Sequence, residues 1–257
     1  MPAINPTVLN EKLDALLSKR ILVDSFPHEI STILSFYADQ TKRSTAAAAA
    51  LEPTERMRVP APVLRALCTK IHQRGRTPED EWLSAAEKIW RSGLQEMQLV
   101  SVCMLSEVAQ AEMINTASQW AAESDDPRVL RSLASECVQS MRSSISDDLL
   151  VLSQGWLAEA STRAFGLLVL RQLFEDASVQ ELPAVFEQLS GLTAHVRGIE
   201  SNALEELLTL LAARSPAETA AFLLDEITHG DAKSIRFIRN FNHQLPEPYQ
   251  SQILRSI

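Results

Sequence analysis

The stretch Ser146–Asp176, SDDLLVLSQGWLAEASTRAFGLLVLRQLFED, decides the fold of this chain. Apolar residues recur in its first half at the spacing of an amphipathic helix, namely Leu149, Leu152 and Trp156. Its second half, from Arg163, is apolar on nearly all sides, and such a helix must be covered by neighbours over most of its surface. We therefore predict two helices joined by a tight corner near Ser161, with further helices packed before and after them.

Strongly apolar helices recur along the chain at a regular period. Five apolar runs begin near Glu96, Pro127, Thr162, Val196 and Lys233, roughly 31 to 37 residues apart. This is the period of helix-pair repeats of the HEAT and armadillo kind. Strand signals such as a long apolar/polar alternation or an Asn-Gly hairpin turn are absent. The sequence predicts an all-α protein, a right-handed α-solenoid of HEAT/armadillo-like helix pairs with a concave face.

The segment before these repeats has a different character. Residues 5–19 and 26–40 predict two amphipathic helices, and residues 41–54 combine two basic residues, an alanine run and Pro53. Alanine favours helix but packs shallowly, and proline ends a helix, so we expect an exposed helical linker here. We assign residues 1–54 to an N-terminal helical cap and linker and residues 55–257 to the solenoid, which could together form one continuous domain.

Two helix starts carry good capping signals. Thr77 is suited to the N-cap and Pro78 to the first turn of a helix expected to run to Arg91. Asp126 followed by Pro127 predicts the start of a helix that continues to Met141.

Composition excludes several classes of protein. The formal net charge of -9 disfavours binding of nucleic acid or anionic membrane over the whole surface, although a local basic groove is compatible with it. No apolar run is long enough for a membrane span, and the N-terminus does not resemble a signal peptide. The three cysteines are far apart and odd in number, so we expect buried, reduced thiols and a cytoplasmic location: Cys68, Cys103 and Cys137.

No cofactor or metal site is expected from sequence motifs. The chain contains no CxxC pair, no zinc spacing, no HExxH and no glycine-rich phosphate loop, and its five histidines are scattered. The four tryptophans fall on helical stripes, so we expect core packing rather than base stacking from Trp82, Trp90, Trp120 and Trp156.

The stretch Arg56–Ile71, RMRVPAPVLRALCTKI, resembles the segment that precedes the HEAT-like pairs in the AlkD-like DNA alkylation repair family. Three later stretches follow the same order: EMQLVSVCMLSEV, WLAEASTRAFGLLVL and NALEELLTLLAARSPAETAAFL. The resemblance covers roughly Arg56 to the end of the chain. It implies a HEAT-repeat fold of the DNA glycosylase superfamily and hydrolytic removal of N3- or N7-alkylated purines from DNA.

The resemblance also implies which residues would do this work. The family's catalytic carboxylate follows a tryptophan by four residues and stabilises the charge that develops on the sugar. Here the tryptophan position falls near Pro127 and the carboxylate position on Arg131 or Ser132, so neither matches. The second family tryptophan falls near Glu206, and the phosphate-contacting arginine matches Arg163. The resemblance therefore implies a divergent member that lacks the catalytic aspartate, with Asp125 or Asp126 as a fallback.

Basic residues recur at the heads of the repeat helices, where they could line one face of a solenoid and contact phosphates. They could equally pair with acids of the neighbouring repeat. The members are Arg128, Arg131, Arg163, Arg197, Lys233, Arg236 and Arg239.

We predict a non-catalytic binding module that uses this face for a protein partner or a nucleic-acid backbone. The alternative is an active glycosylase for alkylated purines. The two differ in whether an acid stands beside an aromatic side chain and basic residues on the binding face.

Overall fold

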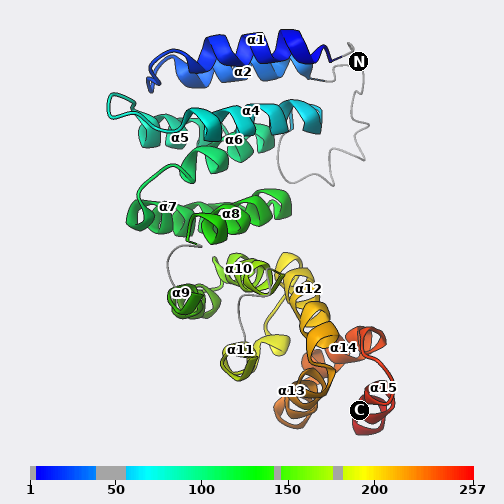
Figure 1. Cartoon of the computed structure of the whole chain (residues 1–257). Coiled ribbons are helices and arrows are strands. Elements are labelled where there is room, and N and C mark those ends of the chain that lie inside the picture. The colour runs from blue at the N-terminus through cyan, green and yellow to red at the C-terminus, as the bar shows by residue number, and fades with distance from the viewer. Residues whose placement is uncertain (1–3, 39–55, 142–145, 176–181) are drawn as a thin grey trace. The chain divides into compact units, whose positions relative to one another are not determined.

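A computed structural model describes residues 4–38, 56–141, 146–175 and 182–257. These residues form fourteen α-helices and two short 3-10 helices, and no strand occurs among them (Figure 1). The all-α prediction is confirmed, and the succession of helices is consistent with a helical-repeat fold, while the right-handed twist stays a prediction. The predicted linker at 41–54 lies outside the described residues, and the boundary at 54/55 also stays a prediction.

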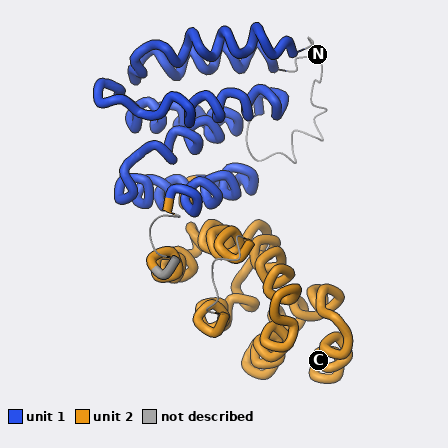
Figure 2. The backbone as a smooth tube through the Cα atoms, in the orientation of Figure 1, with its two compact units in different colours: residues 1–120, 124–140 blue, residues 121–123, 141–257 orange. Residues whose placement is uncertain are grey.

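The chain divides into two compact units, residues 1–120 with 124–140 and residues 121–123 with 141–257 (Figure 2). Unit 1 holds seven described helices: α1 (Pro6–Leu17), α2 (Phe26–Tyr37), α4 (Ala61–Arg74), α5 (Trp82–Trp90), α6 (Gln95–Leu105), α7 (Gln110–Glu123) and α8 (Pro127–Ser140).

Unit 1 is built in layers around α6. The first layer packs on the second through α1 against α4 and α2 against α5 (Figure 1). Helix α6 packs on α4, α5 and α8, and all but two of its residues are buried. A helix covered on so many sides needs an apolar surface nearly all round, which the run from Met97 to Leu105 supplies.

Unit 2 is built around α10. Its elements are α9 (Ser146–Ala158), α10 (Arg163–Glu175), α11 (Leu182–Leu189), η1 (Leu192–Ala194), α12 (Ile199–Arg214), α13 (Pro216–His229), α14 (Ala232–Phe241), η2 (Asn242–Gln244) and α15 (Tyr249–Ser256). Helix α10 lies between α9 and α12, α12 packs on α13, and α13 packs on α14 and α15. The central helix is thus the one whose sequence is apolar on all sides, as predicted.

The predicted period matches the helix starts. Helices α6, α8, α10, α12 and α14 begin at residues 95, 127, 163, 199 and 232, each within three residues of the predicted start. Asp126 caps α8 as expected, because its Oδ1 accepts hydrogen bonds from the N–H groups of Arg128 at 2.8 Å and Val129 at 3.3 Å.

A glycine allows α9 and α10 to approach closely at their corner. The Thr162 hydroxyl donates to the Trp156 carbonyl at 2.9 Å and ties the two helices together. At Gly166 a Cβ atom would stand 3.0 Å from the Cβ of Trp156 and 3.3 Å from the backbone nitrogen of Leu157. Gly155 in α9 has no such neighbour. The close packing of this pair therefore depends on the missing side chain at residue 166.

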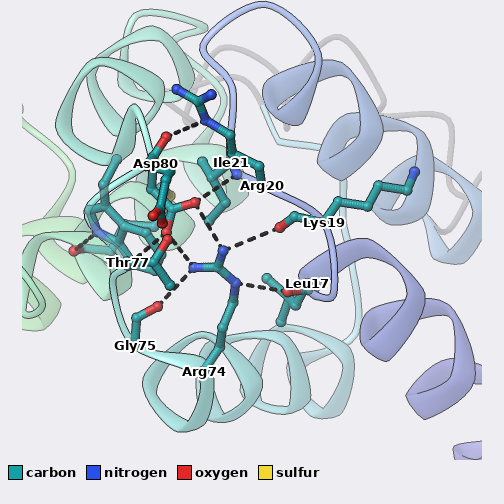
Figure 3. Close-up of polar contacts among 11 residues, drawn as sticks. Leu17, Lys19, Arg20, Ile21, Arg74, Gly75, Thr77 and Asp80 are labelled. Atoms are coloured by element: carbon teal, nitrogen blue, oxygen red, sulfur yellow. Dashed lines mark hydrogen bonds and ion pairs between the residues drawn. The ribbon is translucent and has the colours of Figure 1, made fainter.

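The predicted start of the helix at Pro78 is wrong, because α5 begins only at Trp82. Residues 77–81 form a turn instead, in which the carboxylate of Asp80 accepts the N–H of Thr77 at 2.9 Å. The same carboxylate accepts the N–H of Ile21 at 2.8 Å, from the loop between α1 and α2 (Figure 3). A regular helical turn from Pro78 is thus replaced by a turn that joins two layers.

Arg74 completes this junction. Its guanidinium binds both oxygens of Asp80, at 2.7 and 2.9 Å, and donates to the carbonyl oxygen of Leu17 at 2.7 Å (Figure 3). Burial alone would raise the pKa of Asp80. The Arg74 guanidinium and the N–H groups of Ile21 and Thr77 outweigh burial and hold this pKa well below its usual range.

The prediction of three reduced cysteines is wrong for two of them. Cys68 on α4 and Cys103 on α6 form a disulfide, with their Cα atoms 5.6 Å apart and a sequence separation of 35. Cys137 on α8 is a buried free thiol. The pairing removes the cysteine argument for a reducing compartment, so the cytoplasmic location stays a prediction. No helix within the described ranges is long and apolar enough to cross a membrane.

Substituting the two glycines of the α9–α10 pair should give opposite results. Gly155→Ala should raise the free energy of unfolding by about 0.5–1 kcal/mol, because alanine is the better helix former and meets no neighbour. Gly166→Ala should lower it by about 1 kcal/mol or more, because overpacking outweighs the same helical gain. Denaturant unfolding of both variants measures the difference, and equal stabilisation by both would contradict the packing described.

The Asp80 junction should make stability depend on pH. The folded pKa of Asp80 lies below the unfolded value of about 4, so its contribution is present above about pH 4 and fades as the pH falls further. Asp80→Asn should cost about 3–5 kcal/mol at neutral pH, because it leaves Arg74 buried without its partner. The difference in free energy of unfolding between the wild type and Asp80→Asn should narrow below about pH 4.

Denaturant unfolding at a series of pH values tests this. The control is Asp14→Asn: Asp14 is itself exposed in its ion pair with Lys70, so the change should stay under about 1 kcal/mol. A gap between wild type and Asp80→Asn that is constant from neutral to acid pH would contradict the prediction.

Candidate nucleic-acid interface

The seven predicted cations fall in both units. Arg128 and Arg131 lie on α8 in unit 1, three residues apart and both exposed. The other five lie in unit 2: Arg163, Arg197, Lys233, Arg236 and Arg239. Six of the seven are exposed, and only Arg163 is partly enclosed. Any phosphate-binding surface must therefore be judged separately for each unit.

Helix α14 carries the densest group of predicted cations. Its start is fixed by Asp231, whose side chain accepts the N–H groups of Lys233 at 2.8 Å and Ser234 at 3.1 Å. These backbone donors, Ser234 first, lower the pKa of Asp231. The helix buries one face and exposes the cations Lys233, Arg236 and Arg239 on the other. We call these three residues the α14 row.

The α14 row forms no close ion pair within the described residues, although Lys233 interacts electrostatically with Asp231 at the helix start. No acid within the described residues forms an ion pair with Lys233, Arg236 or Arg239, and all three are exposed. Arg197 follows η1, which packs against α14, so a fourth exposed cation belongs to a neighbouring element. Unpaired cations at regular helical spacing can bind a phosphate chain without first breaking an internal bond.

Arg163 is held inside unit 2. Its Nε donates to the carbonyl oxygen of Leu157 at 3.0 Å, and its Nη1 lies 3.4 Å from Oε1 of Glu200. The side chain is 14% exposed, and Glu200 also accepts the N–H of Arg197 at 3.1 Å. Arg163 thus joins α9, α10 and α12. The phosphate contact assigned to it by resemblance stays a prediction.

The two fallback acids differ in availability. Asp126 is 1% exposed, and besides capping α8 it accepts a hydrogen bond from Nε2 of Gln95 at 2.5 Å and faces the Arg56 guanidinium at 3.9 Å. Its oxygens are committed to the fold and cannot face a DNA sugar. Asp125 is exposed at the same helix start. The position matched to the family's carboxylate falls on Arg131 or Ser132 of α8, of which Arg131 is exposed and Ser132 half-buried.

Glu96 is a structural residue that sequence reasoning missed. Its buried carboxylate accepts the N–H groups of Met57 at 2.8 Å, Arg58 at 2.7 Å and Val59 at 3.2 Å. Arg58 has a φ of 61°, a left-handed conformation that favours glycine and that the Glu96 bonds hold in place. The signal was present in the sequence, since Glu96 heads the apolar run of α6. The stretch that carries the family resemblance is thus anchored by a buried acid.

The four tryptophans form core contacts, as predicted. All are buried, Trp90 stacks on Trp120 at 4.5 Å between ring centroids, and Trp82 donates its Nε1–H to the carbonyl oxygen of Met104. Trp156 meets Phe165 edge to face at 4.8 Å. In this structure none of the four presents its ring to solvent as a platform for a nucleobase.

Comparison with known proteins gives one match. A family model described as DNA alkylation repair enzyme matches residues 30–237. No curated protein and no solved structure matches the chain.

The enclosed position of Arg163 generates a prediction. Arg163→Glu should cost about 2–4 kcal/mol of stability, because it removes a bond to the α9 carbonyl and places two carboxylates together at Glu200. The matched control is Arg236→Glu, an exposed charge reversal in the same unit, which should change stability by less than about 0.5 kcal/mol. Thermal and denaturant unfolding measure both. If Arg163→Glu is as stable as the wild type, the internal bonds of Arg163 contribute little, and its guanidinium is available for phosphate in the wild type.

Proposed function

We propose that this chain binds the phosphate backbone of DNA and releases no base. The chain belongs to the family of DNA alkylation repair enzymes, as its sequence resemblance predicted. The observation that carries the proposal is the α14 row, three exposed cations that form no ion pair with any acid among the described residues. Family membership makes DNA the ligand of choice over other polyanions. Exposed cations provide affinity without requiring a reactive group at the surface.

The spacing of the α14 row suits a phosphate chain. Lys233, Arg236 and Arg239 follow one another at three-residue steps, so each step rises about 4.5 Å and the row covers about a third of the helix circumference. Their long side chains can reach successive phosphates along one strand. Because the whole protein carries a net charge of -9, binding by this row must be local and strongly weakened by salt.

The acids support a role without catalysis. Asp126 is buried and committed to the start of α8, and the position matched to the family's carboxylate falls on Arg131 or Ser132, neither of which is an acid. A cation at that position would destabilise a positive charge developing on the sugar. The buried tryptophans also provide no aromatic surface beside an acid.

A second candidate function is glycosylase activity at Asp125. The observation that favours it is the exposure of this carboxylate at the head of α8, on the N-terminal side of the position where the resemblance places the family's acid. The two functions differ in one measurable product, a released alkylated base.

DNA binding by the α14 row is tested by gel retardation of duplex DNA at two salt concentrations. The triple charge reversal Lys233→Glu, Arg236→Glu and Arg239→Glu should abolish retardation at moderate salt. If each cation neutralises one phosphate, losing all three should also reduce the slope of log affinity against log salt by about 3.

The matched control reverses three exposed cations of unit 1, namely Arg76, Lys88 and Arg91. It makes the same change in net charge, and the exposed ion pairs of Lys88 with Asp24 and Arg91 with Glu87 contribute little stability. This variant should keep most of the retardation. Equal loss in both triple variants would attribute binding to net charge alone and contradict the assignment to α14.

Base release is scored in parallel with methylated DNA. No release above the rate in buffer is expected from the wild type. Release that disappears in Asp125→Asn would overturn the non-catalytic proposal in favour of the glycosylase. Absence of both release and salt-dependent retardation would overturn DNA binding altogether and point to a protein partner.

A further inference from the structure

Three helices of unit 1 bring metal-binding side chains together. His72 on α4, Cys103 on α6 and Glu136 on α8 each offer one ligand atom, and these atoms lie within 4.8 Å of one another. Cys68 stands one helical turn before His72 on α4 and is joined to Cys103 by the disulfide. The cluster therefore contains two sulfurs, an imidazole and a carboxylate from three different elements.

His72 is oriented from both sides. Its Nδ1 lies 3.1 Å from the Ser106 hydroxyl and 3.5 Å from Oε1 of Glu107, and its Nε2 lies 3.8 Å from Oε1 of Glu136. A ring nitrogen bonded to a hydroxyl or carboxylate fixes the tautomer in which the other nitrogen can bind a metal. In this arrangement Nε2 faces the cluster, and Ser106 with Glu107 forms its support.

The separations suit a zinc ion. Zinc binds nitrogen and oxygen at about 2.0–2.2 Å and sulfur at about 2.3 Å, so two ligands of one ion can stand up to about 4 Å apart. The 3.8 Å between His72 Nε2 and Glu136 Oε1 already meets this limit, and the widest separation of 4.8 Å exceeds it by less than the reach of a rotamer change. Thiolate, imidazole and carboxylate together are the donor set that zinc prefers over magnesium or calcium.

The disulfide decides whether the sulfurs can serve as ligands. The sulfurs of a disulfide carry no thiolate charge, whereas a thiolate binds zinc strongly. A dithiol reductant supplies two electrons and two protons, cleaves the bond between Cys68 and Cys103, and itself becomes a disulfide. Zinc then displaces the two thiol protons to solvent. We propose that the reduced form of unit 1 binds one zinc ion through Cys68, His72, Cys103 and Glu136, and that the disulfide form is its metal-free counterpart.

Charge and access support this site. Two carboxylates stand beside the His72 ring, with Oε1 of Glu107 3.5 Å from Nδ1 and Oε1 of Glu136 3.8 Å from Nε2. A dication would relieve the cost of holding several negative groups at one place. His72 is exposed, and Cys68 and Glu136 are half-buried, so an ion can enter from solvent. The nearby Cys137 is a buried free thiol, and it is not part of the group of ligand atoms that lie within 4.8 Å of one another.

The test uses the full chain, reduced with a phosphine that is then removed, and titrated with zinc against a chromophoric chelator. Reduced wild type should bind one equivalent, and its unfolding temperature should rise with added zinc. The disulfide form should bind at least about 100-fold more weakly, because both thiolates are lost. Cobalt in place of zinc should give thiolate-to-metal charge-transfer absorption in the reduced form alone.

Single variants separate this site from adventitious binding. His72→Gln and Glu136→Gln should each weaken binding by at least about tenfold, since loss of even an outer-shell partner costs about that much. The matched controls are His28→Gln and Glu112→Gln, exposed residues on α2 and α7, which should leave binding unchanged. Thermal unfolding of each reduced, metal-free variant checks that it is folded.

Cys68→Ser covers the case in which the native disulfide resists reduction. It leaves Cys103 as a thiol with His72 and Glu136, three ligands that should still bind zinc, and adding His72→Gln to it should remove the binding. Three results would overturn the proposal: equal affinity in the reduced and disulfide forms, no zinc binding by reduced wild type or Cys68→Ser, or equal loss in the His72 and His28 variants.

Discussion

The ion pair between Arg74 and Asp80 is the interaction on which the first layers of unit 1 depend. Asp80 has no side-chain exposure, and an ionised carboxylate in that position is stable only if its charge and its lone pairs are both satisfied. Arg74 supplies the charge, and backbone N–H groups from two loops supply the remaining bonds. The α1–α2 pair is thereby attached to the α4–α5 turn by polar bonds as well as by apolar packing.

Buried acids that accept backbone N–H groups recur along the chain. Glu96 accepts three consecutive N–H groups before α4, Asp126 caps α8, and Glu226 accepts the N–H of Gly191 at 2.7 Å and the hydroxyl of Thr193 ahead of α12. Each acid is buried and lies at or beside a connection. Short connections between packed helices leave backbone donors without helical partners, and a buried donor must be bonded. Acidic side chains meet that need without adding a further helix turn.

This use of acids bears directly on function. An acid committed to backbone donors and to an arginine cannot also stabilise a charge on a bound sugar, and Asp126 is such an acid. The cations divide in the same way. Arg163 bonds within unit 2, whereas the α14 row forms no ion pair in the described part of the chain. Residues of like charge at the heads of different helices thus have different roles, and burial together with bonding partners separates them better than sequence position does.

The sequence predicted the helices well because each leaves a periodic apolar stripe. The starts of α8 and α10 followed from Asp126 and from the apolar run after Arg163. It predicted α5 poorly, because the capping signal at Thr77 competes with a bond to Asp80 that links to a loop 59 residues away. The enclosure of Arg163 by Glu200, 37 residues further on, was equally hidden. Local propensity contains no information about such distant partners.

The cysteines also belong to a feature that local sequence did not predict, a group of metal-binding side chains formed by packing. Cys68, Cys103 and Cys137 follow no metal-binding spacing, so sequence gave no reason to group them with His72 or Glu136. Packing of α4 and α8 on α6 creates the group, since each helix contributes one or two side chains at a matching height. A ligand at this point would therefore join all three helices and stabilise unit 1 as a whole. Since Arg128 and Arg131 lie on the same α8, its effect would extend to the helix that carries these two exposed cations.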